Sequence, residues 1–572
     1  MKRQFILTAF LSFLILASCS DNSYDCYSWT YDPDVINIDN VVSANNAEEH
    51  PHDNLKTKID KDFLVLFYIN GDTPANDYLF YQMAQIGKGL RNVRRYDGIT
   101  PKKAYNNITA AGLWDGYNKD AEFTPNYYYP YTSVLEFIFP EQEYTKNIVK
   151  DIKNFSIDYS SEIMKSTNNW LTDIQEANLA DSNTLKEFLS WAIAKYNSDS
   201  SKEIILVLIG MAGGSFGDET GSYIPPDFSR STCRDYSHES YYLSASDIKK
   251  ALNDNGFTDT NKLPLLVMDT GLSASIEDTF ELKDCVQALL TSPTEAPAGG
   301  MDLNYFLTTL TKNTSIYDIG NANVNIYANK NYGTQTQTTN GDASLTFMDL
   351  TTIGTLADNV NLLSAEILSR KDTKEIEYSD GKKYSMYDLM YNKTLKDGFL
   401  YYSSTVENSI TDKTMHYLAL YQHKIPGDTF FIGYFYQYDL TYLSYAVRRA
   451  AEKSGANSLY YYANQVIENL SEVIVSSWRN GTGSKYGLYP KLNSTFNDAA
   501  SLLHFGITIG GPARSQNKNA DGSYIYLQPY NFSDFAYKDY QDSTGTTWKY
   551  LLLSLFPEQF VENKFTVYEQ YR

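Results

Sequence analysis

Cysteine and histidine are the residues of this sequence best able to carry nucleophilic chemistry. Cys233 and His238 stand five positions apart, a spacing at which a loop can bring a thiol and an imidazole into contact. An imidazole that takes the thiol proton leaves a thiolate, which attacks carbonyl carbon atoms. Cys233 and His238 are therefore a candidate nucleophile and base, although a single cysteine more often serves packing. Cys285 lies in a helical pattern and is predicted to be a buried helix cysteine.

A second candidate is the Asp269-Thr270-Gly271 tripeptide, which follows an apolar run as one half of an aspartic-protease site does. That chemistry needs two carboxylates that share one proton. The sequence holds no second such motif, so we do not assign this activity. The histidines and cysteines also lack the spacing of metal ligands, and we expect neither a metal nor a cofactor.

Four continuous apolar runs predict the strands that position these residues. They are Phe63–Ile69, Ile108–Trp114, Ile204–Ile209 and Leu263–Met268. Runs of this length, each ended by polar residues or glycine, are typical of strands that are buried on both faces of a parallel sheet.

Helical patterns separate the later strands. Residues 184–196 repeat apolar side chains at helical spacing, and Thr184 and Glu187 have the spacing of a capping box. Ser244 and Asp247 show the same signature before a second helix. Alternating strands and helices predict an α/β fold with a parallel sheet, and such sheets bind ligands beyond the carboxyl ends of their strands.

The segments after two of these strands resemble the clostripain family of cysteine peptidases. Leu206–Ser215 is similar to the family strand that ends in a general-base histidine, and Met268–Ser273 to the strand that ends in the nucleophilic cysteine. Further similar segments are Phe67–Asp72, Leu113–Gly116, Glu176–Ala192, Tyr242–Ser244, Ser275–Leu282, Ser344–Leu350 and Phe505–Pro512. The resemblance implies a caspase-like, mostly parallel sheet flanked by helices, with a C-terminal α/β extension or second domain. It also implies cysteine endopeptidase activity.

Both catalytic positions of that family are replaced here. Met211 stands where the histidine is expected, and Gly271 stands where the cysteine is expected. A methionine cannot accept a proton near neutral pH and a glycine has no side chain, so thiol chemistry is lost at both positions. We predict a catalytically inactive pseudopeptidase that binds a peptide, a protein or a glycan. There are two alternatives. One is an active peptidase that uses Cys233 and His238, and the other is a purely structural envelope component.

The resemblance also nominates residues for a binding groove at the carboxyl edge of the sheet. Asp269 matches a family aspartate that helps to recognise a basic residue of the substrate, whereas the second acidic pocket residue, expected near Ala298 or Gly299, is absent. An aspartate at a strand end, such as Asp269, more often organises the adjoining loop by hydrogen bonds than contacts a ligand. The complete candidate set is Asp269, Asp115, Glu176, Asn178, Ser292 and Glu295.

The beginning of the chain resembles a bacterial lipoprotein signal peptide. Lys2 and Arg3 precede an apolar run that is too short for a permanent membrane span, and Leu16–Cys19 resembles a lipobox. Cys19 is therefore the predicted lipidation site and the membrane anchor. The acidic, polar residues after it resemble the surface-export signal of Bacteroidetes lipoproteins. We expect a location in the cell envelope, at the outer membrane or surface of a Bacteroidetes-like bacterium.

Charge and length limit the partners and divide the chain. The formal charge of −21 becomes −23 once Lys2 and Arg3 are removed with the signal peptide, and such a charge repels nucleic acid. The 50 tyrosines favour a binding role at glycans or peptides. The pairing of Cys26, Cys233 and Cys285 stays open. We predict a signal peptide (1–18), a flexible tether (19–60), a peptidase-like domain (61–320) and a C-terminal region (321–572), with a loop over 321–342 at the junction.

Overall fold

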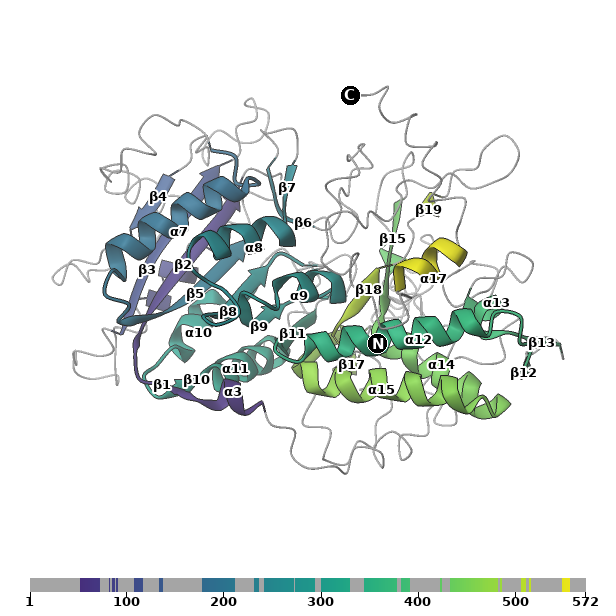
Figure 1. Ribbon diagram of the computed structural model, residues 1–572. Coiled ribbons are helices and arrows are strands. Elements are labelled where there is room, and N and C mark those ends of the chain that lie inside the picture. Colours follow the sequence, from purple (N-terminus) through teal and green to yellow (C-terminus); the bar gives the residue numbers. More distant parts are fainter. Residues whose placement is uncertain are drawn as a thin grey trace, which may run out of the picture.

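A large mixed sheet forms the centre of the protein (Figure 1). The computed structural model describes residues 52–71, 82, 85–87, 89–90, 107–116, 133–136, 177–210, 231–235, 241–271, 273–293, 300–329, 344–377, 382–390, 422–423, 433–481, 484–485, 506–510, 514–515 and 548–555. Cys19, Cys26, Met211, His238, Glu176 and Glu295 lie outside these residues. Among the described residues, no helix is both long enough and apolar enough to cross a membrane.

Within the described residues the sheet has nine strands in the order β17-β16-β11-β9-β8-β5-β2-β3-β4. Their bounds are β2 Asp62–Gly71, β3 Ile108–Gly116, β4 Ser133–Glu136, β5 Lys202–Ile209, β8 Leu263–Asp269, β9 Val286–Thr291, β11 Ser344–Asp349, β16 Ile474–Gly481 and β17 Ser484–Lys485. The five central strands from β9 to β3 run parallel, and the outer strands pair antiparallel. The predicted mostly parallel α/β sheet and its four strands are therefore confirmed.

Helices cover both faces of the sheet, which explains why the strand sequences are apolar throughout. Leu64, Leu66 and Tyr68 of β2 pack on one face, while Phe63 and Val65 pack on the other. The first face is covered by α7 (Ser182–Tyr196), α8 (Ala245–Asp254) and α9 (Ile276–Leu282), and the second by α3 (Asp53–Lys56), α10 (Leu303–Thr309) and α11 (Ile316–Asn329).

Side chains cap the N-termini of α7 and α8, and one of the two predicted capping boxes is absent. Ser244 and Asp247 form the predicted capping box of α8, because each side chain bonds the backbone N–H of the other residue. The predicted box of Thr184 and Glu187 is wrong. Helix α7 begins two residues earlier, at Ser182, since the Asp181 carboxylate accepts the N–H of Asn183 and acts as the N-cap.

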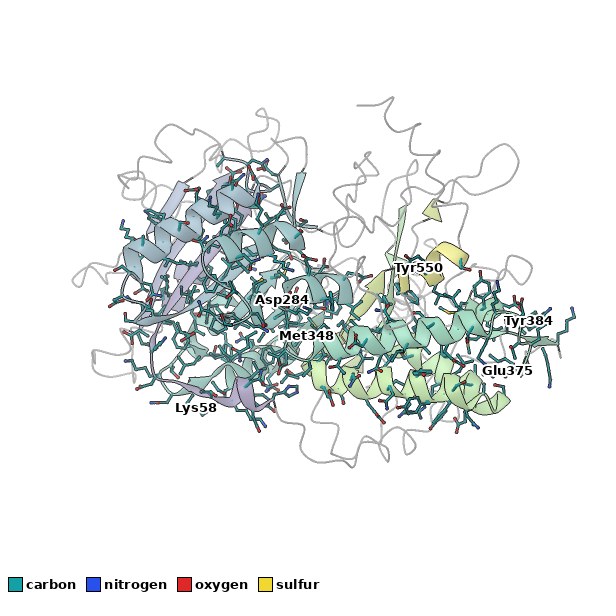
Figure 2. The ribbon with its side chains drawn as sticks, viewed as in Figure 1. Lys58, Asp284, Met348, Glu375, Tyr384 and Tyr550 are labelled. Atoms are coloured by element: carbon teal, nitrogen blue, oxygen red, sulfur yellow. The ribbon has the colours of Figure 1, made fainter. Side chains whose placement is uncertain are left out.

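The C-terminal half adds helices and strands to the same body. Helix α15 (Asn457–Val473) packs against both α12 (Ile353–Ser369) and α14 (Leu440–Ser454) beside the sheet, where Figure 2 places Met348 of β11 at the junction. The remaining elements are β6 Ser231–Asp235, β7 Tyr241–Ser244, β12 Ile376–Glu377, β13 Lys383–Tyr384, α13 Met386–Met390, β14 Gln422–His423, β15 Gly433–Asp439, β18 Thr508–Gly510, β19 Arg514–Ser515 and α17 Trp548–Leu555, with β1 (Lys58–Ile59) and β10 (Thr314–Ser315) at the opposite end.

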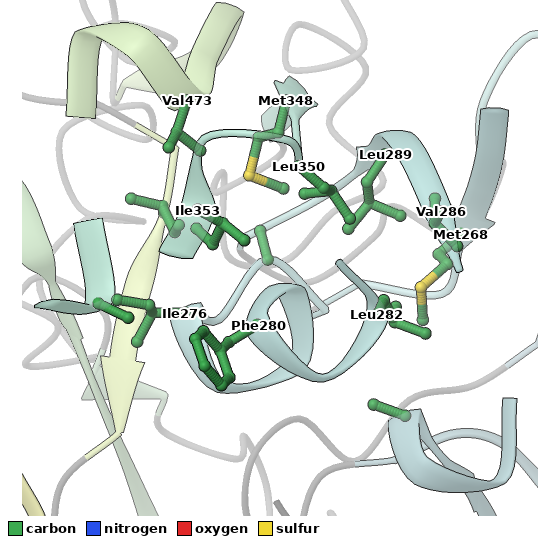
Figure 3. Close-up of a cluster of buried hydrophobic side chains, with 14 of the residues drawn as sticks. Met268, Ile276, Phe280, Leu282, Val286, Leu289, Met348, Leu350, Ile353 and Val473 are labelled. Carbon is green, nitrogen blue, oxygen red and sulfur yellow. The ribbon is translucent and has the colours of Figure 1, made fainter. Parts of the chain in front are cut away.

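An apolar cluster joins these helices to the sheet. Phe280 of α9, Met348 of β11, Ile353 of α12 and Val473 of α15 converge in it (Figure 3). Burial of such side chains contributes roughly 1.5–3 kcal/mol each. The helical half is thus held by the same core as the strands that carry the candidate site.

Two expectations about connecting segments differ from the structure. Residues 52–60, assigned to the flexible tether, form α3 and β1, because Leu55 is buried and β1 pairs with β10. Residues 321–329, assigned to a loop, continue helix α11, because Val324 and Tyr327 pack against the sheet. Strands β11 and β16 also lie beyond the boundary placed at residue 320, so the domain division stays a prediction.

Gly506 shows how closely the C-terminal segment approaches the sheet. Its φ is +85°, a conformation that side chains disfavour. A β-carbon there would overlap the hydroxyl of Thr346 in β11 and lie 2.9 Å from the Cβ of Ser477 in β16. The next residue, Ile507, accepts a hydrogen bond from the N–H of Leu440 at the start of α14.

Changing Gly506→Ala should destabilise the protein by at least about 3 kcal/mol, since left-handed strain adds to a clash with buried atoms. Gly455→Ala is the matched control: its φ is +73°, but nothing lies within 4 Å of the added atom. We expect it to cost about 1 kcal/mol. Denaturant unfolding of both variants measures the difference, and equal losses would show that Gly506 is not packed against β11.

Candidate functional site

The two positions at which the family resemblance expects catalytic residues follow neighbouring strands in the sequence. Strands β5 and β8 pair in parallel with Ile209 opposite Asp269, so both strands end at the same level of the carboxyl edge. Gly210, after β5, immediately precedes Met211, and Gly271 follows β8 by two residues. The register therefore places the ends of these strands side by side, as an active site shared between them requires.

Gly271 is a bare backbone position within a tightly bonded turn. Its φ is +68°, a left-handed value that glycine adopts without strain. The Ser273 hydroxyl donates to the carbonyl of Gly271 at 2.7 Å and lies 2.9 Å from the Thr270 hydroxyl. The N–H of Ser273 donates to the carbonyl of Ser292 at 3.0 Å. These contacts hold the turn in a conformation that an L-residue at position 271 would strain.

Asp269 bonds the backbone of a neighbouring loop. Both of its carboxylate oxygens lie 3.0 Å from the N–H of Met301, and Oδ2 accepts from the Gln82 amide at 3.2 Å. Gly300 packs against this carboxylate with φ of +56°, and a β-carbon there would overlap Asp269 and Gln82. Burial raises the pKa of Asp269 to about 6, although the bond from Met301 opposes the shift. Asp269 thus ties β8 to the turn before α10.

Cys233 does not have the surroundings of a reactive thiol. It is fully buried, and its Sγ lies 3.9 Å from the carbonyl of Ile209 and 3.8 Å from the Thr232 hydroxyl. Its backbone has φ of +52°, and its carbonyl accepts the Asn70 amide at 2.9 Å. Burial raises the pKa of Cys233 to about 12, which removes the thiolate near neutral pH. Its predicted partner, His238, lies outside the described residues.

Cys285 is also a buried, free thiol. It is buried as predicted, but it stands in the turn between α9 and β9 rather than inside a helix, where Sγ lies 3.4 Å from the carbonyl of Leu282. Burial raises the pKa of Cys285 to about 12. Cys233 and Cys285 are therefore not joined to each other by a disulfide.

The other described candidates are divided between two places. The Ser292 hydroxyl lies 3.0 Å from that of Ser344, and the Ser292 carbonyl supports the Gly271 turn, so Ser292 belongs with Asp269. Asp115 ends β3, separated from β8 by two strands. Asn178 closes a local turn by accepting the N–H of Ala180 at 2.8 Å.

Several residues that shape this edge carry no sequence signal. The Tyr68 hydroxyl donates to the carbonyl of Leu179, and Asp235 accepts the Leu179 N–H at 2.9 Å, so both backbone groups of Leu179 are held, from β2 and β6. Burial, with the nearby Cys233 and carboxylates, raises the pKa of Tyr68 well above its usual value. In the sequence, Tyr68 is one more residue of an apolar run, and nothing there indicates this contact. Gln82 and Met301 likewise lie far from Asp269 in the sequence.

Asp269→Asn should change the pH dependence of stability. The folded pKa of about 6 lies above the unfolded value, so protonated Asp269 favours folding, and this stability is lost as the pH rises through about 6. Between about pH 4 and pH 7, the unfolding free energy of the wild type should therefore fall by up to about 3 kcal/mol more than that of Asp269→Asn. Denaturant unfolding at both pH values measures this difference.

Asp259→Asn, which removes an exposed carboxylate in an ion pair with Lys262, controls for the loss of one acidic group. Parallel pH profiles of wild type and Asp269→Asn would contradict a raised pKa at this position.

Comparisons with known proteins identify a family and distant structural neighbours. The model of the clostripain family, Peptidase_C11, matches residues 150–544. An inactive zymogen C11 protease from Parabacteroides distasonis is 14% identical, with a TM-score of 0.42 over 79% of this chain and 92% of that chain. A secreted C11 cysteine protease from Bacteroides thetaiotaomicron with an irreversible peptide inhibitor is 13% identical, with a TM-score of 0.42 over 81% and 95%.

A search of curated protein sequences found no match. The solved structures are distant, whereas the family model extends from the segment before α7 to the segment before α17 and covers more than half of the chain. This chain therefore belongs to the clostripain family.

Proposed function

We propose that this chain is a catalytically inactive member of the clostripain family, anchored in the cell envelope by a lipid, which binds a peptide, a protein or a glycan at the carboxyl edge of its sheet. Gly271 carries the proposal. It stands at the end of β8, where the family resemblance expects the nucleophile, and it has no side chain that could attack a carbonyl.

The backbone around Gly271 supports a lasting loss of activity. A cysteine at φ of +68° would cost roughly 1–2 kcal/mol in left-handed strain. The turn is also held by Ser273, which donates to the carbonyl of Gly271 and is itself held by Ser292. Met211, beyond the end of β5, adds a second loss, since a thioether is no general base.

The environment of Cys233 argues against a relocated nucleophile. A catalytic thiol needs a lowered pKa and access to substrate, whereas Cys233 is fully buried with a pKa of about 12. Cys285 is equally buried with the same shift, so neither thiol can replace the missing one without rearrangement.

Binding at the carboxyl edge is supported by how firmly that edge is built. The turn at Gly271 and the turn at Gly300 are both fixed by buried hydrogen bonds, from Ser273 and Asp269 respectively. A preformed edge binds a ligand without the entropic cost of ordering loops. Cys19 in its lipobox-like setting supports the anchor and the envelope location.

Incubation of the purified protein with arginine- and lysine-directed fluorogenic peptides should give no turnover. A thiol-reactive probe should label native Cys233 and Cys285 roughly a thousandfold more slowly than the denatured chain at pH 7, because a pKa near 12 leaves very little thiolate. Peptide mapping by mass spectrometry assigns each label to its cysteine.

Cys233→Ala and Cys285→Ala form the control pair. Turnover in wild type that disappears in Cys233→Ala but persists in Cys285→Ala would establish an active peptidase and refute the proposal.

A further inference from the structure

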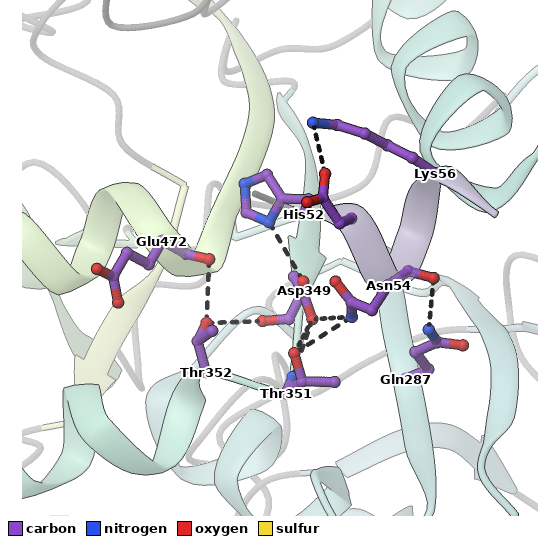
Figure 4. A network of polar contacts seen from close by, with 9 residues as sticks. His52, Asn54, Lys56, Gln287, Asp349, Thr351, Thr352 and Glu472 are labelled. Carbon is purple, nitrogen blue, oxygen red and sulfur yellow. Dashed lines mark hydrogen bonds and ion pairs between the residues drawn. The ribbon is translucent and has the colours of Figure 1, made fainter. Parts of the chain in front are cut away.

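Residues 52–59, which we call the strap, comprise α3 and β1, and Figure 4 shows His52 and Asn54 of the strap beside Asp349. The strap begins beside Asp349 at the end of β11 and leads into β2. Because β9, β8 and β5 lie between β11 and β2, the strap passes the amino ends of three strands. It therefore fastens together parts of the sheet that are distant in sequence.

Polar contacts hold the beginning of the strap. His52 Nδ1 lies 3.2 Å from Asp349 Oδ2, and the Asn54 amide donates to Asp349 Oδ1 and to the Thr351 hydroxyl, each at 3.3 Å. Burial acts to raise the pKa of Asp349, but hydrogen bonds from His52 and Thr351 outweigh it and hold the pKa below its usual value. Asp349 is therefore a charged acceptor at neutral pH, and such bonds are the stronger ones.

Packing and strand pairing hold the rest of the strap. Leu55 is buried, with 1% of its surface exposed, and Gln287 at the start of β9 donates to the carbonyl of Asn54 at 3.2 Å. Strand β1 pairs antiparallel with β10, and the N–H of Asn313 donates to the carbonyl of Ile59 at 2.7 Å.

The strap also holds the first basic residues after the signal-like segment. Between Arg3 and Lys56 the sequence contains no lysine or arginine, and Lys58 follows two residues later. Their side chains are 41% and 57% exposed, but the Lys56 N–H bonds the carbonyl of His52 and Lys58 belongs to β1. A protease cleaves such a bonded backbone from its opened form, so the rate follows the population of that form.

We propose that the strap is a concealed processing site, in which docking shields the peptide bonds after Lys56 and Lys58 from proteases specific for basic residues. Hydrolysis of the bond after Lys56 consumes one water molecule and leaves a carboxylate on Lys56 and an amine on Thr57. Given the lipid anchor of the proposed function, on which this role depends, undocking of the strap controls whether such a protease sheds the body from the membrane.

The test measures trypsin cleavage of the purified full chain in detergent, with new N-termini at Thr57 and Ile59 counted by mass spectrometry. Every variant carries Lys61→Gln, because Lys61 is exposed just after the strap. A synthetic peptide of residues 50–62 with the same change gives the rate without docking. We expect cleavage of the folded chain to be at least about 100-fold slower than cleavage of the peptide.

Leu55→Ala should accelerate cleavage at least tenfold, since it removes the buried anchor of the strap. The double variant His52→Ala with Asn54→Ala should also accelerate cleavage at least tenfold, because it removes the hydrogen bonds to Asp349. It is the deciding variant if Leu55→Ala unfolds the protein. Asp259→Asn, at an exposed residue outside the strap, is the control and should stay within about twofold of wild type.

Cleavage of wild type as fast as the peptide, unchanged rates in both strap variants, or equal acceleration by Asp259→Asn would each overturn the proposal. Membrane fractionation before protease treatment tests the lipid anchor independently of the cleavage rates. A chain that is soluble from the start contradicts lipid anchoring, whereas the cleavage rates still decide whether the strap is shielded.

Discussion

The parallel pairing of β5 with β8 is the constraint on which the site depends. It sets Ile209 opposite Asp269, so that the residues after both strands emerge together at one edge. In the proposed function, the positions that the family resemblance assigns to the histidine and the cysteine follow these strands in the sequence as Met211 and Gly271, which offer neither a base nor a nucleophile. The apolar face and the hydrogen bonds of the pair do not depend on the side chains at positions 211 and 271. The proposed loss of catalysis is therefore compatible with an intact sheet.

Polar side chains at this edge form hydrogen bonds with backbone groups. Asp269 bonds Met301, Ser273 bonds Gly271, and Asn70 bonds the carbonyl of Cys233. Each bond satisfies a group that would otherwise be costly to bury. In its described residues this edge is therefore held by backbone hydrogen bonds and presents no accessible cysteine thiol, which supports the proposed binding role.

The sequence predicts the centre of this fold better than its borders. Continuous apolar runs such as Phe63–Ile69 predict buried strands because both faces of the sheet are covered. The strap was missed because eight mostly polar residues with a single buried leucine look like a tether, and its partner Asp349 lies almost 300 residues away. Gln82 and Met301 were missed for the same reason, since they meet Asp269 through tertiary contacts that no local spacing encodes.

The buried charge at Asp269 bears on the choice between a binding protein and a structural one. A carboxyl whose folded pKa is raised lowers stability when it ionises, so at neutral pH Asp269 is a less stable choice than a neutral residue able to accept the same backbone bond. Carboxyl groups with perturbed pKa values cluster at functional sites, where the geometry that function needs is kept at a cost in stability. The geometry that Asp269 sets is the turn at Gly300 and Met301, beside the same strand end as Gly271. The cost of an ionised Asp269 at this strand end therefore supports the proposed binding role over a purely structural one.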